Sequence, residues 1–512
     1  MPRAAHLTPR FPGAATPPRG QEPAQEVTAA SDPSPPPSRG RALLWSALEG
    51  GGLAILSLVA LVVFARLLTP AEVGVAALAL GLVQLLNLPV EMLFHDALVQ
   101  RPRADDRHFD AAFTVSTILG VALAALCWLM EPVLAEGFGA WNFALVLAWM
   151  SLSLPAAGLG SALVARNRRE YRFRSLAVRS LVARAVAFLV GIVLAFAGAG
   201  VWAMVAQHLL QVWLSAAVLW IGAADRPRFR RAWAEARELV AFGGPATGAL
   251  TVEWVVHRVL TLQIGVVLGA EAAGQFSLAT RVVDMLRATL AGALLQPALP
   301  LLSRLQDTPR ALRTVWHGAT ELTCAATFPL FAGLAVTAPS LVTLVFGAAW
   351  RPAAPLVSLL AVMAMLHFAR LYAVPTLTAL GRPREVLRVR LAELPSLLVI
   401  PLLGVANLVG AVAIYAGRSL LALPTEVRAL ARAADIGARR QAAGLWQLAL
   451  LAAAMAAGVH VVGLVVSGRL PGNVLAAQIA AGTALWPALL ALGRPALLRR
   501  ILAMAIQATR GI

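Results

Sequence analysis

Six arginines lie inside long apolar stretches of this sequence, where a charged side chain is costly to bury. They are Arg184, Arg258, Arg281, Arg287, Arg370 and Arg418. A guanidinium group keeps its charge at any physiological pH, and its fork of N–H donors matches the oxygens of phosphate. Ionisable groups within a membrane usually face a water-filled cavity or each other. These arginines therefore predict either an anion-binding cavity or a set of intramembrane ion pairs.

Arg258 lies near the middle of its apolar stretch, next to two other ionisable residues. Glu253 and His257 are four residues apart, and this spacing places them on one face of a helix. We expect Arg258 to contact an anion in a central cavity. The alternative is an intramembrane ion pair with Glu253 or with another helix. Glu253 and His257 are also candidates for binding a coupling ion.

Arg281, Asp284 and Arg287 follow one another at intervals of three residues, which keeps them on one stripe of a helix. Asp284 can neutralise only one of the two arginines, so the stripe stays positive. That charge suits a ligand with phosphate groups, whereas a self-compensated salt-bridge ladder would need no ligand. Asp284 is a further candidate for binding a coupling ion.

Three more charged residues within apolar stretches are candidates. Arg418 is in the middle of its stretch, and Arg370 lies towards the end of another, near His367; we expect both to contact an anionic head group. Glu49 could bind a proton or a cation, or form an ion pair at the membrane edge. Arg184 is close to the end of its stretch, and we expect it to extend to the aqueous surface.

Several kinds of chemistry have no support in the sequence. All 43 basic residues are arginine, so a phosphate-binding loop with its lysine is excluded. No cluster of His, Cys or Asp has the spacing of metal ligands, and we expect neither a metal nor a cofactor. Cys127 and Cys324 lie far apart inside apolar stretches and read as small core residues.

The composition identifies the bilayer as the main solvent. Of the 512 residues 59% are apolar and only 13% are charged, whereas a soluble domain carries about 25% charge. The fold class is therefore an all-α polytopic membrane protein of about 14 transmembrane helices. The expected spans are 42–65, 73–95, 110–133, 141–164, 179–198, 201–222, 244–267, 275–299, 315–337, 354–377, 389–405, 407–424, 443–466 and 474–492.

The arginines between these spans predict the orientation of the chain. With the N-terminus in the cytoplasm, the inside loops and flanks hold 31 arginines, and the outside loops hold only Arg66, Arg351 and Arg469. This asymmetry is typical of a protein of the bacterial inner membrane with both termini in the cytoplasm. The net charge of +18 therefore reflects topology, and we expect no nucleic-acid partner.

An internal repeat divides the spans into two sets of six. Leu68, Gly74, Leu78 and Ala79 recur at an offset of 200 residues, and residues 138–141 are echoed at 346–350. Six helices per unit give a parallel repeat, a pattern of secondary transporters with a midplane site. The expected organisation begins with a disordered Pro-rich cytoplasmic tail (1–40), which is followed by an N-lobe (42–223) and a C-lobe (239–424). Two further spans (443–492) and a basic amphipathic helix (496–510) complete it.

Several short motifs occur in the order found in a known family. They are FARLLTPAEVG at 64–74, DALVQR at 96–101, RNRREYRFR at 166–174, PLLSR at 300–304, FGAAW at 346–350 and APL at 354–356. With these motifs the chain resembles bacterial polysaccharide biosynthesis proteins. These are the oligosaccharide flippases of the multidrug/oligosaccharidyl-lipid/polysaccharide exporter superfamily, which includes the MATE-like transporters. The resemblance covers about residues 42–430.

The resemblance implies a flippase without enzymatic activity. Its substrate would be an undecaprenyl-pyrophosphate-linked oligosaccharide for exopolysaccharide or lipopolysaccharide, moved across the inner membrane by alternating access. Its partners would be that lipid, membrane lipids and possible polymerase and export machinery. Alternatives are a multidrug antiporter of the same superfamily, a membrane-embedded glycan polymerase or ligase, and a passive scaffold. An antiporter would favour an acidic cavity, and a polymerase would need a large outer loop, whereas the longest one expected is about 338–353.

Overall fold

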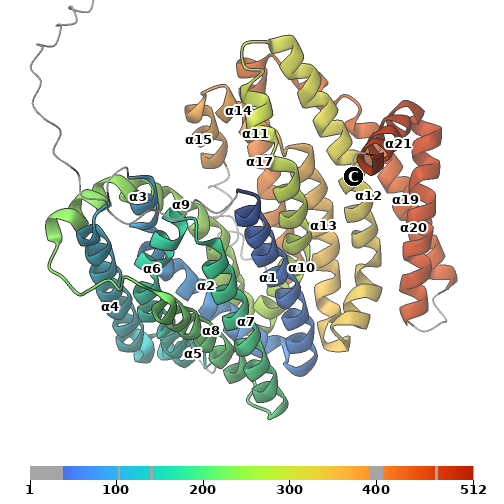
Figure 1. Cartoon of the computed structure of the whole chain (residues 1–512). Coiled ribbons are helices and arrows are strands. Elements are labelled where there is room, and N and C mark those ends of the chain that lie inside the picture. The colour runs from blue at the N-terminus through green and yellow to red at the C-terminus, as the bar shows by residue number, and fades with distance from the viewer. Residues whose placement is uncertain (1–38, 102–103, 139–141, 393–406, 467–470, 511–512) are drawn as a thin grey trace, which may run out of the picture.

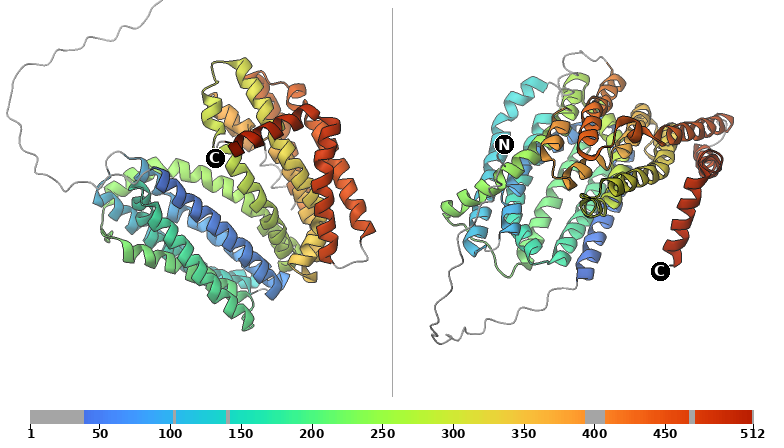
Figure 2. Two further views of the ribbon diagram at one scale, coloured as in Figure 1. Left: turned by 45° about the vertical axis from the view of Figure 1, so that its right-hand side comes forward. Right: turned by 90° about the horizontal axis from the view of Figure 1, so that it is seen from above.

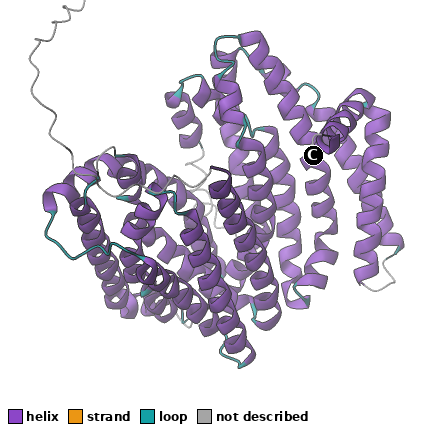
Figure 3. Ribbon diagram, viewed as in Figure 1, coloured by secondary structure: helices purple, strands orange, loops and turns teal. Residues whose placement is uncertain are grey.

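The computed structural model describes residues 39–101, 104–138, 142–392, 407–466 and 471–510. Figure 3 shows helices joined by loops, without a strand in these ranges. The helices of the first half are α1 (Arg39–Leu67), α2 (Pro70–Met92), α3 (His95–Gln100), α4 (Asp106–Phe138), α5 (Phe143–Ser151), α6 (Ser153–Arg169), α7 (Phe173–Phe196) and α8 (Val201–Gly222).

The helices of the second half follow in chain order. They are α9 (Trp233–Leu268), α10 (Ala270–Leu295), α11 (Ala298–Ser303), α12 (Pro309–Val345), the 3₁₀ helix η1 (Ala348–Ala353), α13 (Ala354–Ala369), α14 (Ala373–Ala379), α15 (Pro383–Leu391) and α17 (Leu408–Ala434). The C-terminal part contains α18 (Ala438–Ala442), α19 (Leu445–Val465), α20 (Pro471–Gly493) and α21 (Pro495–Arg510).

The expected all-α membrane architecture is confirmed. In the described ranges 12 helical segments are long and apolar enough to cross a membrane. The expected span 244–267 lies within α9, where a shorter apolar part runs over Arg258–Leu268. The expected span 389–405 falls mostly on 393–406, outside the described residues. The number of 14 spans therefore remains approximate.

The expected spans 141–164 and 354–377 are each interrupted well within their length by a break between two helices. α5 ends at Ser151, and α13 ends just before Arg370. Pro155 and Pro375 follow these breaks. Proline lacks an N–H group, and its ring clashes with the carbonyl four residues earlier, which belongs to Ser151 or Leu371 here. The second break places Arg370 at a helix end.

The helices form two halves that meet at one end of the molecule. α1 to α8 pack together on one side, and α10 to α17 on the other (Figures 1 and 2). The left view of Figure 2 shows the halves converging at the lower end and diverging towards the upper end. α19 and α20 pack on the outer side of α12, where Cys324 and Phe328 meet Leu448 and Met455 in an apolar core.

The connection between the halves follows the surface of the first half. The backbone N–H of Arg228 donates to Asp110 Oδ1 at 2.8 Å, and that of Arg230 donates to Thr114 Oγ1 at 3.1 Å. α9 then starts alongside α3 and α4, where Glu238 pairs with Arg101 at 2.7 Å. α9 thus belongs to the second half in sequence but contacts both halves.

The motif at 68–74 has a clear local role, because it starts α2. Thr69 is the N-cap: its hydroxyl accepts from the backbone N–H of Glu72, and Glu72 accepts from the backbone N–H of Thr69. Pro70 occupies the first helical position, where its missing N–H costs nothing. The loop before α2 is therefore fixed in place.

Gly74 and Gly274, which occupy matching positions of the repeat, are in direct contact where α2 crosses α10. A Cβ atom on Gly74 would lie 1.8 Å from the carbonyl oxygen of Ala270, and one on Gly274 would lie 1.9 Å from that of Pro70. Only glycine fits such a crossing. We call this region, with residues 65–74, 269–275 and 345–350, the closed end, and the opposite end the arginine-rich end.

Further hydrogen bonds hold the closed end together. The Trp350 indole donates to the carbonyl of Ala65 at 2.6 Å, and Arg66 Nε donates to the carbonyl of Val345 at 2.8 Å. Trp350 is fully buried. These bonds join the end of α1 in the first half to the α12–η1 turn in the second.

Candidate functional site

Arg184, Arg258 and Arg281 lie at nearly the same depth along their helices; we call them the arginine cluster. They are 12, 10 and 11 residues from the ends of α7, α9 and α10 at the closed end. At about 1.5 Å per residue these separations are roughly 15–18 Å. The apolar core of a bilayer is about 30 Å thick, so the cluster lies near its middle.

The cluster joins the two halves of the molecule. Arg184 of α7 donates to Ser57 Oγ of α1 at 2.8 Å, and Arg258 of α9 donates to Gln84 of α2. The charges of Arg258 and Arg184 both act on Arg281 of α10. The three guanidinium groups thus lie close enough for their charges to interact, on helices of both halves.

The charges of Arg184 and Arg281 are not cancelled by an acid of the described residues. Arg281 has no ion-pair partner there, and Arg184 Nε is buried without a hydrogen-bond acceptor. Arg258 interacts electrostatically with Asp284. Asp284 is itself paired with Arg287 at 2.9 Å, so a single carboxylate is shared by two arginines. The arrangement can therefore bind a doubly or triply charged anion.

A cavity of about 490 Å³ in the second half adjoins the cluster. Its walls come from α10, α13, α14, α15 and α17, and we call it the C-lobe cavity. The polar side chains in its wall are Thr280, Asp284, Arg287, His367, Arg370, Arg390, Tyr415, Ser419 and Glu426. Asp284 lines this cavity, lies one helical turn from Arg281 on α10, and acts electrostatically on Arg258, so the cavity lies next to the cluster.

Arg370 is held by an acid that the sequence analysis did not consider. Its Nε lies 3.0 Å from both oxygens of Glu426, its Nη2 donates to Oε2, and its Nη1 donates to the carbonyl of Ser419 at 2.8 Å. The side chain of Glu426 is only 5% exposed. We expected the apolar span to end at residue 424, but α17 continues to Ala434 and buries this carboxylate. Arg370 is thus charge-compensated, although it lines the cavity.

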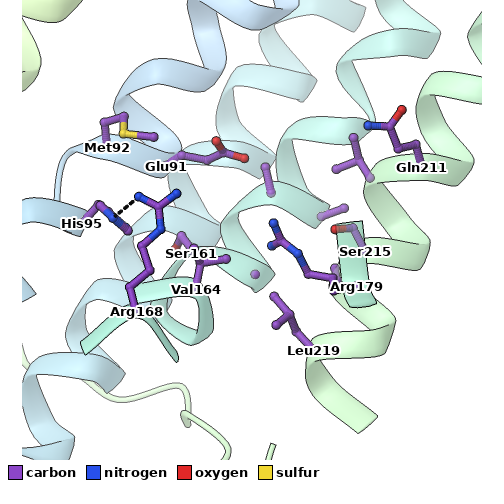
Figure 4. A pocket seen from close by; sticks show the side chains of 15 residues that line it. Glu91, Met92, His95, Ser161, Val164, Arg168, Arg179, Gln211, Ser215 and Leu219 are labelled. Carbon is purple, nitrogen blue, oxygen red and sulfur yellow. Dashed lines mark hydrogen bonds between the residues drawn. The ribbon is translucent and has the colours of Figure 1, made fainter. Parts of the chain in front are cut away.

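A second, smaller pocket of about 250 Å³ lies inside the first half. Figure 4 shows Glu91 of α2 between Arg168 of α6 and Arg179 of α7. Arg168 Nη1 lies 3.0 Å from His95 Nε2. Arginine can only donate, so Nε2 must be the acceptor and the ring the neutral tautomer with hydrogen on Nδ1.

Glu49 reaches the same network from α1. The hydroxyl of Ser180 donates to Glu49 Oε1 at 2.7 Å, and Arg179 interacts electrostatically with both Glu49 and Glu91. Two acids therefore balance the two arginines here. Ser180, the partner of Glu49, is one helical turn from Arg184 on α7, and the role of Glu49 in ion coupling remains a prediction.

The structure brings together only part of the predicted set. Arg258, Arg281, Asp284 and Arg287 do form one region. The side chains of Glu253, His257 and Arg418 lie outside the described residues, although the backbones of all three are helical in α9 and α17. The described residues contain no group of three or more His, Cys, Asp or Glu able to hold a metal ion.

Two members of the region were missed by sequence reasoning. Arg184 was expected at the aqueous edge, but α7 starts at Phe173, six residues before the expected span, and the residue lies mid-helix. Gln84 has no charge and stands among apolar residues of α2. A polar amide in such a stretch was the signal that could have identified it.

Comparison with known proteins gives a consistent picture of sequence and fold. The family model described as polysaccharide biosynthesis protein matches residues 63–355. The chain is 25% identical over 317 residues to the succinoglycan biosynthesis transport protein ExoT of Rhizobium meliloti, covering 62% of this chain and 64% of that one. It is 22% identical over 329 residues to the lipopolysaccharide biosynthesis protein WzxC of Escherichia coli, covering 63% and 66%. The chain thus spans slightly less than two thirds of these relatives.

Solved structures share the fold at low sequence identity. The lipid II flippase MurJ in an inward closed conformation matches with a TM-score of 0.70 at 12% identity, over 89% of this chain and all of that one. An inward-facing MATE family multidrug resistance transporter matches with a TM-score of 0.57 at 14% identity, over 77% and 98%. Both matches concern the fold alone.

Proposed function

The chain belongs to the polysaccharide biosynthesis protein family, and we propose that it is a flippase for a lipid-linked oligosaccharide in the bacterial inner membrane. The substrate would be an isoprenoid diphosphate, such as undecaprenyl diphosphate, that carries sugars. The protein would move it from the inner to the outer leaflet by alternating access. No bond in the substrate is made or broken.

The single observation that supports this proposal best is the arginine cluster. A diphosphate carries several negative charges, and leaving it in the middle of a bilayer without counter-charges would be prohibitive. Arg184, Arg258 and Arg281 offer those counter-charges at that depth, from helices of both halves. Contact with both halves is what a substrate needs if its binding is to be coupled to their relative movement.

The orientation in the membrane follows from the arginine asymmetry of the loops. We infer that the arginine-rich end faces the cytoplasm, with both termini, and that the closed end faces the periplasm. The head group would then enter the cluster from the cytoplasmic side, while the isoprenoid chain stays in lipid. Opening of the closed end would release the head group to the outer leaflet.

The competing functions receive less support. A multidrug antiporter for cationic compounds would be opposed by the positive cluster. A glycan polymerase or ligase would require catalytic groups in an outer segment, and the described loops at the closed end are short. The likeness to ExoT, described as a transport protein, also favours transport.

Reconstituted protein tests the proposal directly. Liposomes would contain undecaprenyl diphosphate linked to one glucose, and a membrane-impermeant lectin would report the sugar that reaches the outer leaflet. We expect the wild type to equilibrate the lipid. The variants Arg281→Ala and Arg184→Ala/Arg281→Ala should be at least about tenfold slower, because each lost hydrogen bond to a charged group is worth about 1.5–3 kcal/mol.

Arg382→Ala serves as the matched control, because Arg382 is exposed at the arginine-rich end. It should flip the lipid at the wild-type rate. A double variant as fast as the wild type would remove the cluster from the mechanism, and a wild type that fails to move the lipid would contradict the proposal itself.

A further inference from the structure

The C-lobe cavity is large enough to bind a ligand, but its wall lacks the net positive charge that a second anion would require. Its volume of about 490 Å³ lies within the range of about 300–1,000 Å³ typical of ligand pockets. Arg184 and Arg281 of the arginine cluster, which have no ion-pair partner among the described residues, already offer positive charge for a diphosphate. The chemistry of the cavity wall therefore has to be explained separately.

The charged groups of the wall are largely paired with one another. Arg287 lies 2.9 Å from Asp284, and Arg370 is clamped by Glu426. A paired ion exerts little net attraction on another anion, but it keeps free lone pairs and N–H groups. Asp284 is 55% exposed, so its carboxylate can accept further hydrogen bonds from a ligand. Paired ions of this kind suit neutral hydroxyl groups.

The remaining wall residues suit the two other properties of a sugar ring. Thr280, His367 and Ser419 add side chains that can both donate and accept hydrogen bonds. Tyr415 provides an aromatic ring, whose orientation is held by edge-to-face packing on Phe276 at 6.0 Å and 89°. A sugar presents hydroxyls at its edge and C–H groups on its face, so one ring can use both kinds of contact.

The position of the cavity agrees with this chemistry. Asp284 lines the cavity, lies one helical turn from Arg281 on α10, and acts electrostatically on Arg258 of the cluster. A sugar attached directly to a diphosphate on the cluster would therefore reach the cavity without a spacer. The pocket of the first half is smaller, at about 250 Å³, and its polar network is centred on Glu91.

We propose that the C-lobe cavity is the saccharide subsite of the flippase, which binds the neutral sugars next to the diphosphate. Two sites thus share recognition of the substrate. The arginine cluster binds the diphosphate, and the C-lobe cavity, which is formed by the second half alone, binds the sugar. This inference rests on the proposed function.

Two lipids that differ only by the sugar test the inference. Purified full-length protein would be titrated with undecaprenyl diphosphate and with undecaprenyl diphosphate carrying one glucose, and Kd measured for both. We expect the wild type to bind the glucose-bearing lipid about tenfold tighter, equivalent to about 1.4 kcal/mol. Tyr415→Ala should lose most of this preference while its Kd for the bare diphosphate stays within about twofold of wild type.

A second variant allows the test to succeed or fail even if Tyr415→Ala does not fold. In Asp284→Asn the charge of Arg287 is no longer compensated, so this variant should bind the bare diphosphate more tightly and lose the preference for glucose. Tyr171→Ala is the matched control, because Tyr171 is exposed on a loop of the first half, and it should retain the wild-type preference.

The outcomes separate the two proposals. Variants that keep the wild-type preference, or a wild type that binds both lipids equally, would overturn the saccharide subsite and leave the flippase intact. A wild type that binds neither lipid would overturn the proposed function, and the subsite with it.

Discussion

Single arginines inside the membrane differ in how their charge is compensated. Arg370 is enclosed by Glu426 and the carbonyl of Ser419, whereas Arg281 has neighbours of its own sign and no acid at ion-pair distance among the described residues. Spacing along one helix does not distinguish them, because the decisive partners come from other helices. Arg370 therefore has a structural role, whereas Arg281 is a candidate for contact with a ligand.

The Arg370–Glu426 pair allows a prediction on stability. Arg370→Met should destabilise the protein by about 3–5 kcal/mol, because it leaves a carboxylate buried without its partner. Arg370→Met/Glu426→Leu should recover a large part of that loss, since neither charge remains. Thermal unfolding in detergent would measure both, and a double variant less stable than the single one would contradict this account.

At the scale of whole helices, much was predictable from apolar length alone. Apart from 389–405, which falls mostly outside the described residues, each expected span overlaps a described helix, and the segment expected at 496–510 is helical as α21. The ends of the helices were harder to predict, because several helices continue beyond the membrane core through turns that contain charged residues. α17 runs to Ala434 and α7 begins at Phe173, and these extensions hid the buried Glu426 and the mid-helix position of Arg184.

The site was predictable only within a helix. The stripe of Arg281, Asp284 and Arg287 follows from helical spacing, and the structure keeps it. The meeting of Arg281 with Arg184 and of Arg258 with Gln84 depends on how α10 and α9 pack against α7, α1 and α2. Apolar spans look alike to one another, so the sequence contains little information on which of them become neighbours.

The start of α9 leads to a prediction on pH. The hydrogen bond from Arg101 lowers the pKa of Glu238, with His108 3.8 Å from its second oxygen. A lowered pKa means that the stabilisation is present at neutral pH and is lost as the pH falls through the folded-state pKa. Glu238→Gln should therefore lower the melting temperature slightly at pH 7 and make no difference near pH 3.

Glu235→Gln is the control for this effect, because Glu235 lies 4.0 Å from Arg107 and makes a weaker pair. Its melting temperature should follow that of the wild type more closely across the same pH range. A difference between Glu238→Gln and wild type that grows as the solution becomes more acidic would show that the sign is wrong.

For the molecule as a whole, alternating access requires the closed end to separate. Gly74→Ala would place a methyl group where the carbonyl oxygen of Ala270 now lies, so the closed end could not form as it does. We expect this variant to populate states in which α2 and α10 have moved apart. Spin labels at exposed positions near Leu67 and Leu344 would report a longer distance than in the wild type.

Gly333→Ala in the middle of α12 provides a control, since an added Cβ there meets only Met455 at 3.9 Å. Its distance distribution should match the wild type. If Gly74→Ala gave the same distribution too, the glycine crossing would have to be wider than the structure shows.

The crossing of Gly74 with Gly274 has the geometry of a symmetric dimer interface within one polypeptide. Each glycine lies against the backbone that precedes its counterpart, as in an isologous contact between identical subunits. Substitutions at the two positions should for that reason be interchangeable in effect. A single repeat unit with one such glycine would already possess a surface complementary to itself, so duplication would have joined two partners that could assemble before they were linked.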